Sequence, residues 1–135
     1  MSTPQAQTTT EQNKQIILRW FREVWNEGRR QTIEELFPPE GVLHDGATSY
    51  RGREAFYRFY DEIRSEFSEF EVKEITLLAE GDLVCLHWSA SFKHKQTHKR
   101  LQVTGTSVAC IKDGRFVKAW QNWDQASLAA QLPHV

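Results

Sequence analysis

The chain has little of what marks the specialised classes of protein. It has only two cysteines in 135 residues, too few for a disulfide scaffold, and both lie in strand-like runs. We therefore expect Cys85 and Cys110 to be reduced thiols in a cytoplasmic protein. No apolar run approaches the length of a membrane span, and the polar residues 1–10 contain no apolar segment typical of a signal peptide. We predict no membrane association.

An excess of charge of one sign is also missing. The formal net charge of -1 provides no basic field that would attract nucleic acid or an anionic membrane. No glycine-rich phosphate loop, nucleophile elbow or zinc signature occurs in the sequence. We therefore expect no nucleic-acid partner, no metal site and no cofactor.

The sequence does contain strong apolar periodicity, first with helical spacing. Residues 1–10 are rich in Thr and Gln and predict a disordered tail, followed by one domain over residues 11–135. Further helices are predicted from Thr32 to the Pro38–Pro39 pair and from Arg53 onward. The first helix ends near Gly28, and its predicted buried stripe is Ile17, Trp20, Phe21 and Val24.

The second half of the chain has the alternation of strands. A short strand is predicted at residues 42–44, and longer ones at 70–77, 83–94, 101–111 and 115–123. The apolar phase slips between Val72 and Ile75, which predicts a β-bulge. Strands grouped after helices favour an α+β fold in which helices cover one face of a bent antiparallel sheet.

The last predicted strand offers a candidate pocket. Asp113–Gly114 is a hairpin-turn signal, and side chains alternate between the faces of the strand that follows it. Strict alternation would place Phe116, Trp120, Asn122 and Asp124 on one surface. A surface of aromatic side chains with a few polar groups among them is typical of a small-molecule site.

Several short motifs follow the order of these elements. They are Asn26–Glu27–Gly28, Val42–Leu43–His44–Asp45, Arg51–Gly52–Arg53–Glu54–Ala55, Glu80–Gly81–Asp82 and the segment from Asp113–Gly114 to Asp124. The motifs and the element order resemble the SnoaL-like polyketide cyclase branch of the nuclear-transport-factor-2-like superfamily, over about residues 12–132. The resemblance implies a cone-shaped barrel in which a curved antiparallel sheet wraps a long helix around a central cavity. Ketosteroid isomerases also belong to this superfamily, and other relatives only bind ligands or proteins.

In the cyclases, a carboxylate late in the last strand acts as general acid or base. Asp124 is the candidate here and Asn122 its rival for that place, although an amide cannot be a general base. Asp124 is equally well placed to cap the terminal helix. His44 could transfer a proton near neutral pH, or it could be a hydrogen-bonded interior histidine.

These residues lead to two hypotheses. The first is a cofactor-independent acid/base enzyme, of isomerase, cyclase or hydrolase type, acting on a small hydrophobic carbonyl or polycyclic substrate. The alternative is a non-catalytic module of the same fold that binds a small ligand or another protein. We also expect a homodimer through the outer face of the sheet. The predicted ligand-binding residues are Trp20, Tyr50, Phe56, Phe59, Trp88, Thr106, Val108, Cys110 and Trp120.

Overall fold

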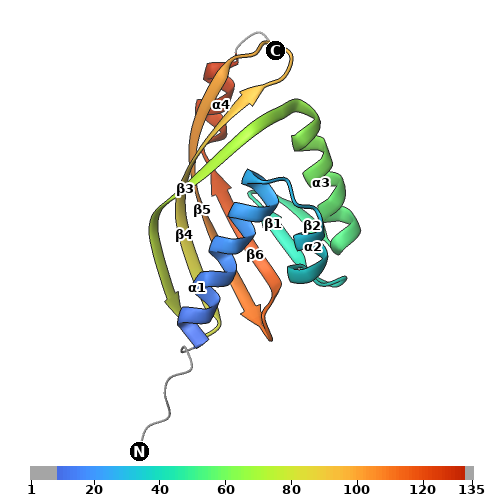
Figure 1. Ribbon diagram of the computed structural model, residues 1–135, viewed down its shortest axis with the longest axis vertical. Coiled ribbons are helices and arrows are strands. Elements are labelled where there is room, and N and C mark those ends of the chain that lie inside the picture. Colours follow the sequence, from blue (N-terminus) through green and yellow to red (C-terminus); the bar gives the residue numbers. More distant parts are fainter. Residues whose placement is uncertain (1–8, 133–135) are drawn as a thin grey trace, which may run out of the picture.

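The computed structural model describes residues 9–132 and has an α+β architecture. Its long helices lie on one side of a single curved sheet (Figure 1). The helices are α1 (Thr9–Trp20), the π-helical η1 (Phe21–Asn26), α2 (Gln31–Leu36), α3 (Arg53–Glu66) and α4 (Gln125–Gln131). The strands are β1 (Val42–Asp45), β2 (Thr48–Arg51), β3 (Phe67–Glu80), β4 (Leu83–His94), β5 (Arg100–Lys112) and β6 (Arg115–Trp123).

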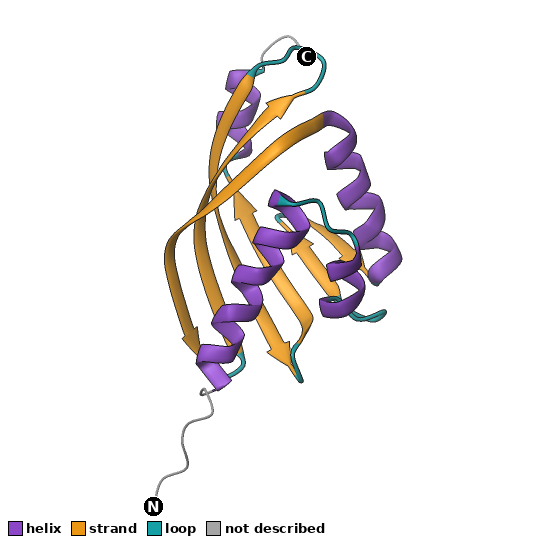
Figure 2. Ribbon diagram, in the orientation of Figure 1, coloured by secondary structure: helices purple, strands orange, loops and turns teal. Residues whose placement is uncertain are grey.

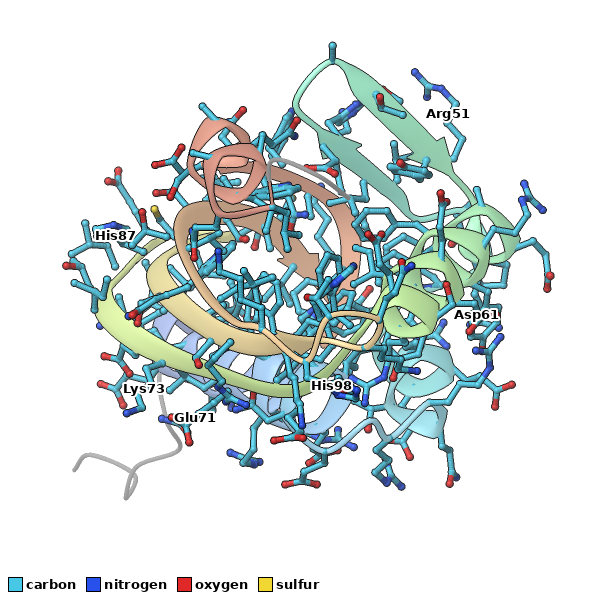
Figure 3. The ribbon with its side chains drawn as sticks, turned by 90° about the horizontal axis from the view of Figure 1, so that it is seen from above. Arg51, Asp61, Glu71, Lys73, His87 and His98 are labelled. Carbon is cyan, nitrogen blue, oxygen red and sulfur yellow. The ribbon has the colours of Figure 1, made fainter. Side chains whose placement is uncertain are left out.

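The sheet is mixed rather than wholly antiparallel. Its strand order is β2-β1-β6-β5-β4-β3, and β1 pairs with β6 in parallel while all the other neighbours are antiparallel. The strands curl into a cone around an interior filled by side chains, and the labelled His87 points away from that interior (Figure 3). The cone predicted from the resemblance is confirmed, with β1 and β2 added as a small hairpin at one edge.

The N-terminal helices fill the concave side of the cone. Helix α1 and η1 run across the sheet (Figure 2), and the predicted stripe of Ile17, Trp20, Phe21 and Val24 is buried throughout. Gly28 ends this segment with a φ of 70°, the left-handed conformation expected of a helix C-terminus. The π-helix was not predicted, because a sequence with helical periodicity does not reveal one widened turn.

The boundaries of the predicted domain need small adjustments. Residues 1–8 of the predicted tail lie outside the described residues, whereas Thr9 and Thr10 form the first turn of α1.

The short strand β2 was missed, since Thr48–Arg51 has no apolar alternation. Among residues 9–132, no helix is both long and apolar enough to cross a membrane.

Register shifts at three places decide which side chains face the interior. The predicted bulge in β3 is confirmed by the shift between Glu74 and Thr76, and a further shift in β3 lies between Ser68 and Glu71. The bulge in β6 was not predicted: Ile111 pairs with Phe116 and Cys110 with Lys118, which leaves Val117 as an extra residue. Because of it, Phe116 points inward but the inward set then continues as Ala119, Gln121 and Trp123.

Candidate functional site

The interior of the cone contains an aromatic cavity with two lobes. The outer lobe has a free volume of about 120 Å³ and lies among side chains of η1, α3, the sheet and α4. The inner lobe is smaller, about 40 Å³, and lies toward α1 and α2. Both lobes are lined by Phe21, Trp25, Phe59 and Gln121, so they are neighbouring parts of one site.

A buried carboxylate lies directly behind the lining of this cavity: Asp45 lines neither lobe itself, but it is hydrogen-bonded to two residues that do. Strand alternation in β1 turns Leu43 and Asp45 inward, and Asp45 is only 9% exposed. Its Oδ1 accepts hydrogen bonds from Trp123 Nε1 at 3.1 Å and from Gln121 Nε2 at 3.3 Å, and both of these donors line the outer lobe. Within residues 9–132, Oδ2 has no hydrogen-bond partner. One oxygen is therefore held in place while the other remains free to accept a proton.

The environment of Asp45 favours its neutral form. Burial raises the pKa of the Asp45 carboxyl above its ordinary value, and the hydrogen bonds from Gln121 and Trp123 oppose that shift only in part. Burial, together with the negative charge of Asp45, also raises the pKa of the nearby Tyr50 phenol. A carboxylate whose pKa is moved toward neutrality by desolvation is typical of a general base in an apolar site.

Two more polar side chains continue from Asp45 across the inner face of the sheet. Asp45 pairs with Gln121 of β6, and Gln121 pairs in turn with Ser107 of β5. We call Asp45, Gln121 and Ser107 the polar row; it spans two strand spacings, about 10 Å. Ser107 is 6% exposed and its Oγ accepts a hydrogen bond from Trp88 Nε1 at 3.0 Å.

The hydroxyl of Ser107 keeps a hydrogen to donate. An indole N–H can only donate, so the bond from Trp88 uses an acceptor position of Oγ and leaves its O–H free. No acceptor among residues 9–132 takes this hydrogen, and Ser107 lines the inner lobe. The bond from Trp88 polarises the hydroxyl and so strengthens it as a donor.

Some of the predicted ligand-binding residues do lie around the cavity. Trp88 lines the outer lobe, Trp20 and Phe56 line the inner lobe, and Phe59 lines both. Tyr50 packs on Phe59 with 4.7 Å between ring centroids but lines neither lobe. That these side chains bind a ligand stays a prediction.

The predicted orientation of Thr106, Val108 and Cys110 is wrong. Alternation in β5 buries the opposite set and turns these three to the outer face of the sheet. The inward positions include Gly105 and Ser107, which are small because the Trp88 ring lies over them. Leu101, Val103 and Ile111 mark the inner face by their hydrophobicity, whereas the small residues between them give no such signal. Cys110 is unpaired, as is Cys85, and both lie on the outer face.

Three further predicted site residues lie on the outer face of the sheet or at the margin of the cavity. His44 is on the face of β1 opposite to Asp45, where its Nδ1 is 2.8 Å from Ser49 Oγ. Its ring stacks on Trp120, which contributes to the inner lobe's lining but is 39% exposed. Asn122 is exposed, because the β6 bulge moves it out of phase with Phe116. The structure therefore does not bring His44 and Asn122 together with Asp124 in the cavity.

Asp124 occupies the N-cap of α4. Its Oδ1 accepts a hydrogen bond from the Ser127 backbone N–H at 2.9 Å, and the residue is exposed. The geometry supports the helix-cap alternative that the sequence left open.

This assignment of Asp124 gives a testable prediction. We expect Asp124→Ala to lower the free energy of unfolding by about 1 kcal/mol, and Asp124→Asn to leave it nearly unchanged, because Asn caps as well as Asp. Urea denaturation of the two variants measures the difference. A stable Asp124→Asn protein that has lost a catalytic activity of the wild type would restore the acid/base role predicted from the sequence.

The residues that sequence reasoning missed are Asp45, Gln121, Ser107 and Trp123. For Asp45 a signal was available, since it alternates with the apolar Leu43 in a four-residue strand. Gln121 and Trp123 could not be found, because their inward orientation depends on the bulge at Val117.

A curved α+β cone enclosing an aromatic cavity, with a buried carboxylate beside it, defines the class: a small cone-shaped domain built around a cavity. The family model of the SnoaL-like polyketide cyclases matches residues 15–132, and the chain belongs to this family. None of the curated proteins matches the chain.

Solved structures show the same fold at low sequence identity. A SnoaL-like protein from Jannaschia sp. CCS1 is 17% identical with a TM-score of 0.86, and the match covers 98% of this chain and 99% of that one. IdmH from Streptomyces antibioticus is 24% identical with a TM-score of 0.81, over 90% and 99% of the two chains. A protein of ketosteroid isomerase-like fold from Catenulispora acidiphila, solved with trimethylamine, is 17% identical with a TM-score of 0.76, over 86% and 90%.

Proposed function

We propose that the protein catalyses proton transfer at an acidic C–H position of a small hydrophobic carbonyl compound, without a cofactor. The observation that carries this proposal is the Asp45 carboxylate, buried directly behind the aromatic cavity's lining residues Gln121 and Trp123. Both of these donate to one of its oxygens, and the other oxygen is free. Family membership supports a small apolar ligand. Asp45 replaces Asp124 as the proposed general base, since Asp124 caps a helix.

The polar row supplies the proposed mechanism. Asp45 Oδ2 takes the proton from a carbon next to a carbonyl group, and the C–H electron pair moves to form an enolate. The Ser107 hydroxyl donates a hydrogen bond to the oxygen on which the negative charge develops. Gln121 lies between the two and holds Asp45 in position through its amide N–H. Where a double bond is conjugated with the enolate, return of the proton from Asp45 to the remote carbon gives isomerisation. Attack of the enolate carbon on a second carbonyl gives cyclisation, and the alkoxide that forms takes the proton back from Asp45.

The substrate would be held mainly by the apolar walls. The lining of the outer lobe is largely aromatic and aliphatic, so burial of apolar surface provides most of the affinity. The polar row then orients the carbonyl group rather than adding much binding free energy.

The predicted homodimer remains a proposal. The outer face of the sheet exposes Leu78, Leu83 and Trp120, which suits an interface.

A generic carbon acid tests the proposal without knowledge of the natural substrate. Ring opening of 5-nitrobenzisoxazole needs only a base: as the proton leaves carbon, the N–O bond breaks, and a coloured nitrile phenolate forms. We expect saturable catalysis by the wild type, inhibited when 6-propionyl-2-dimethylaminonaphthalene fills the cavity. A rate no greater than that of acetate at equal concentration, together with tight binding of the naphthalene, would favour the non-catalytic binding module.

A further inference from the structure

The two lobes of the cavity differ in what can reach them. Phe21 of η1 and Trp88 of β4 face each other with 6.1 Å between ring centroids. Phe21 lines both lobes, and Trp88 joins the outer lobe to Ser107 of the inner lobe through its Nε1 hydrogen bond. These two rings form a constriction where the lobes meet. Neither a ring nor an alkyl chain passes between them, because either would need about 7 Å, two carbon contacts of about 3.5 Å each. A substituent reaches the inner lobe beside the pair, along the residues that both lobes share.

The inner lobe is small, and its far end is apolar. Ala109 and Ala119 are cross-strand partners on β5 and β6, and both line this lobe. Opposite them, Trp20 packs against Phe37 and Phe116 with centroid distances of 6.2 and 5.0 Å. The free space exists because the two sheet residues are alanines. Its volume of about 40 Å³ has room for about three water-sized groups.

The polar row lies at the boundary of the lobes rather than at either end. Gln121 lines both lobes, and Ser107 lines only the inner one. A carbonyl group bonded to Ser107 would therefore lie near the constriction. What extends beyond it must be small, because the inner lobe has a volume of only about 40 Å³. What lies before it can be a larger flat ring system, because the outer lobe has about 120 Å³.

We infer that the site selects a carbonyl compound with two unequal apolar parts. A flat ring system occupies the outer lobe, and a short unbranched substituent of about three carbons or fewer passes beside Phe21 and Trp88 into the inner lobe. Ala119 is the residue that determines the permitted length. This assignment of substrate class rests on the proposed function only for the placement of the carbonyl group; the size selection follows from the walls.

A fluorescent homologous series measures the length limit directly. The 6-acyl-2-dimethylaminonaphthalenes carry a flat ring system, a carbonyl group and an acyl chain that can be varied from acetyl to hexanoyl. For the wild type we expect affinity to rise about fourfold per methylene until the inner lobe is full, and then to fall. Affinity that rises steadily through hexanoyl would overturn the inference.

Two matched variants show which lobe sets the limit on acyl-chain length. Ala119→Val adds two methyl groups to the inner lobe and should weaken the propionyl compound about tenfold while moving the optimum to acetyl. Ala90→Val makes the same change in the outer lobe and should weaken every member alike, with the optimum unmoved. Ala109→Val serves in place of Ala119→Val if thermal unfolding shows that protein to be misfolded. Identical profiles for the inner-lobe and outer-lobe variants would refute the inference.

The binding series is independent of turnover, so the two proposals can fail separately. A length optimum without ring opening of 5-nitrobenzisoxazole contradicts only the general-base proposal. Ring opening with no length optimum contradicts only the division of the substrate between two lobes.

Discussion

Asp45→Asn will lower the rate of 5-nitrobenzisoxazole ring opening by about 10²–10⁴-fold, the usual contribution of a positioned general base. An amide has the shape of the carboxylate, and its oxygen can still accept the hydrogen bonds from Gln121 and Trp123. It cannot take a proton from carbon at neutral pH. Binding of the acylnaphthalenes should be almost unchanged, because the aromatic walls provide the affinity.

The pH dependence of Asp45 adds a second measurement to this variant. Only the ionised carboxylate is a base, so the wild-type rate should fall as pH decreases through the raised pKa of Asp45. The contribution of Asp45 to the free energy of unfolding should depend on pH in the opposite direction to the rate. A folded-state pKa above the unfolded value of about 4 means that the native state binds more protons, so this stabilising contribution is lost as pH rises through that window.

Asp45→Asn should therefore be more stable than the wild type above this pH window and should lose that advantage below it. Asp82→Asn, the same change in the exposed turn between β3 and β4, is the matched control and should alter neither rate nor pH dependence. If Asp45→Asn stays folded and keeps the wild-type rate, Asp45 is not the base.

The overall fold was accessible from the sequence because its signals are local and repeated. The stripe from Ile17 to Val24 and the alternation from Val84 to Phe92 each predict a face that the structure buries. Such patterns require only that one side of an element meets the core. The parallel pairing of β1 with β6 has no local signal, since it joins residues more than seventy positions apart.

The site was harder to predict because single residues decide it. The extra Val117 in β6 exchanges the two faces of the strand, so Gln121 and Trp123 face inward and Asn122 faces outward. Trp120 is left at the margin of the inner lobe, 39% exposed. Asp45 shows a different difficulty. Its alternation with Leu43 extends over a strand of only four residues, so the signal is short. The pairing with Gln121, which the sequence does not show, is what encloses the carboxylate.

The close fit of Gly105 under Trp88 predicts the second large effect. A Cβ at position 105 would lie 2.4 Å from Trp88 Cζ2, 2.6 Å from Cη2 and 2.9 Å from the Cβ of Trp123. The backbone at Gly105 is ordinary, so the constraint is steric rather than conformational. Gly105→Ala must displace the indole, and it should lower the free energy of unfolding by about 1–3 kcal/mol.

The displaced indole would also alter the site. Its shift should break the 3.0 Å bond to Ser107 and move the ring into the outer lobe, so acylnaphthalene affinity should fall at least tenfold. Trp88→Phe supplies the control, because phenylalanine lacks the two indole atoms that crowd position 105. In that background Gly105→Ala should cost much less in urea denaturation, and the double-mutant cycle should show clear coupling. Additive effects of the two changes would mean that the Trp88 ring does not depend on the missing side chain at position 105.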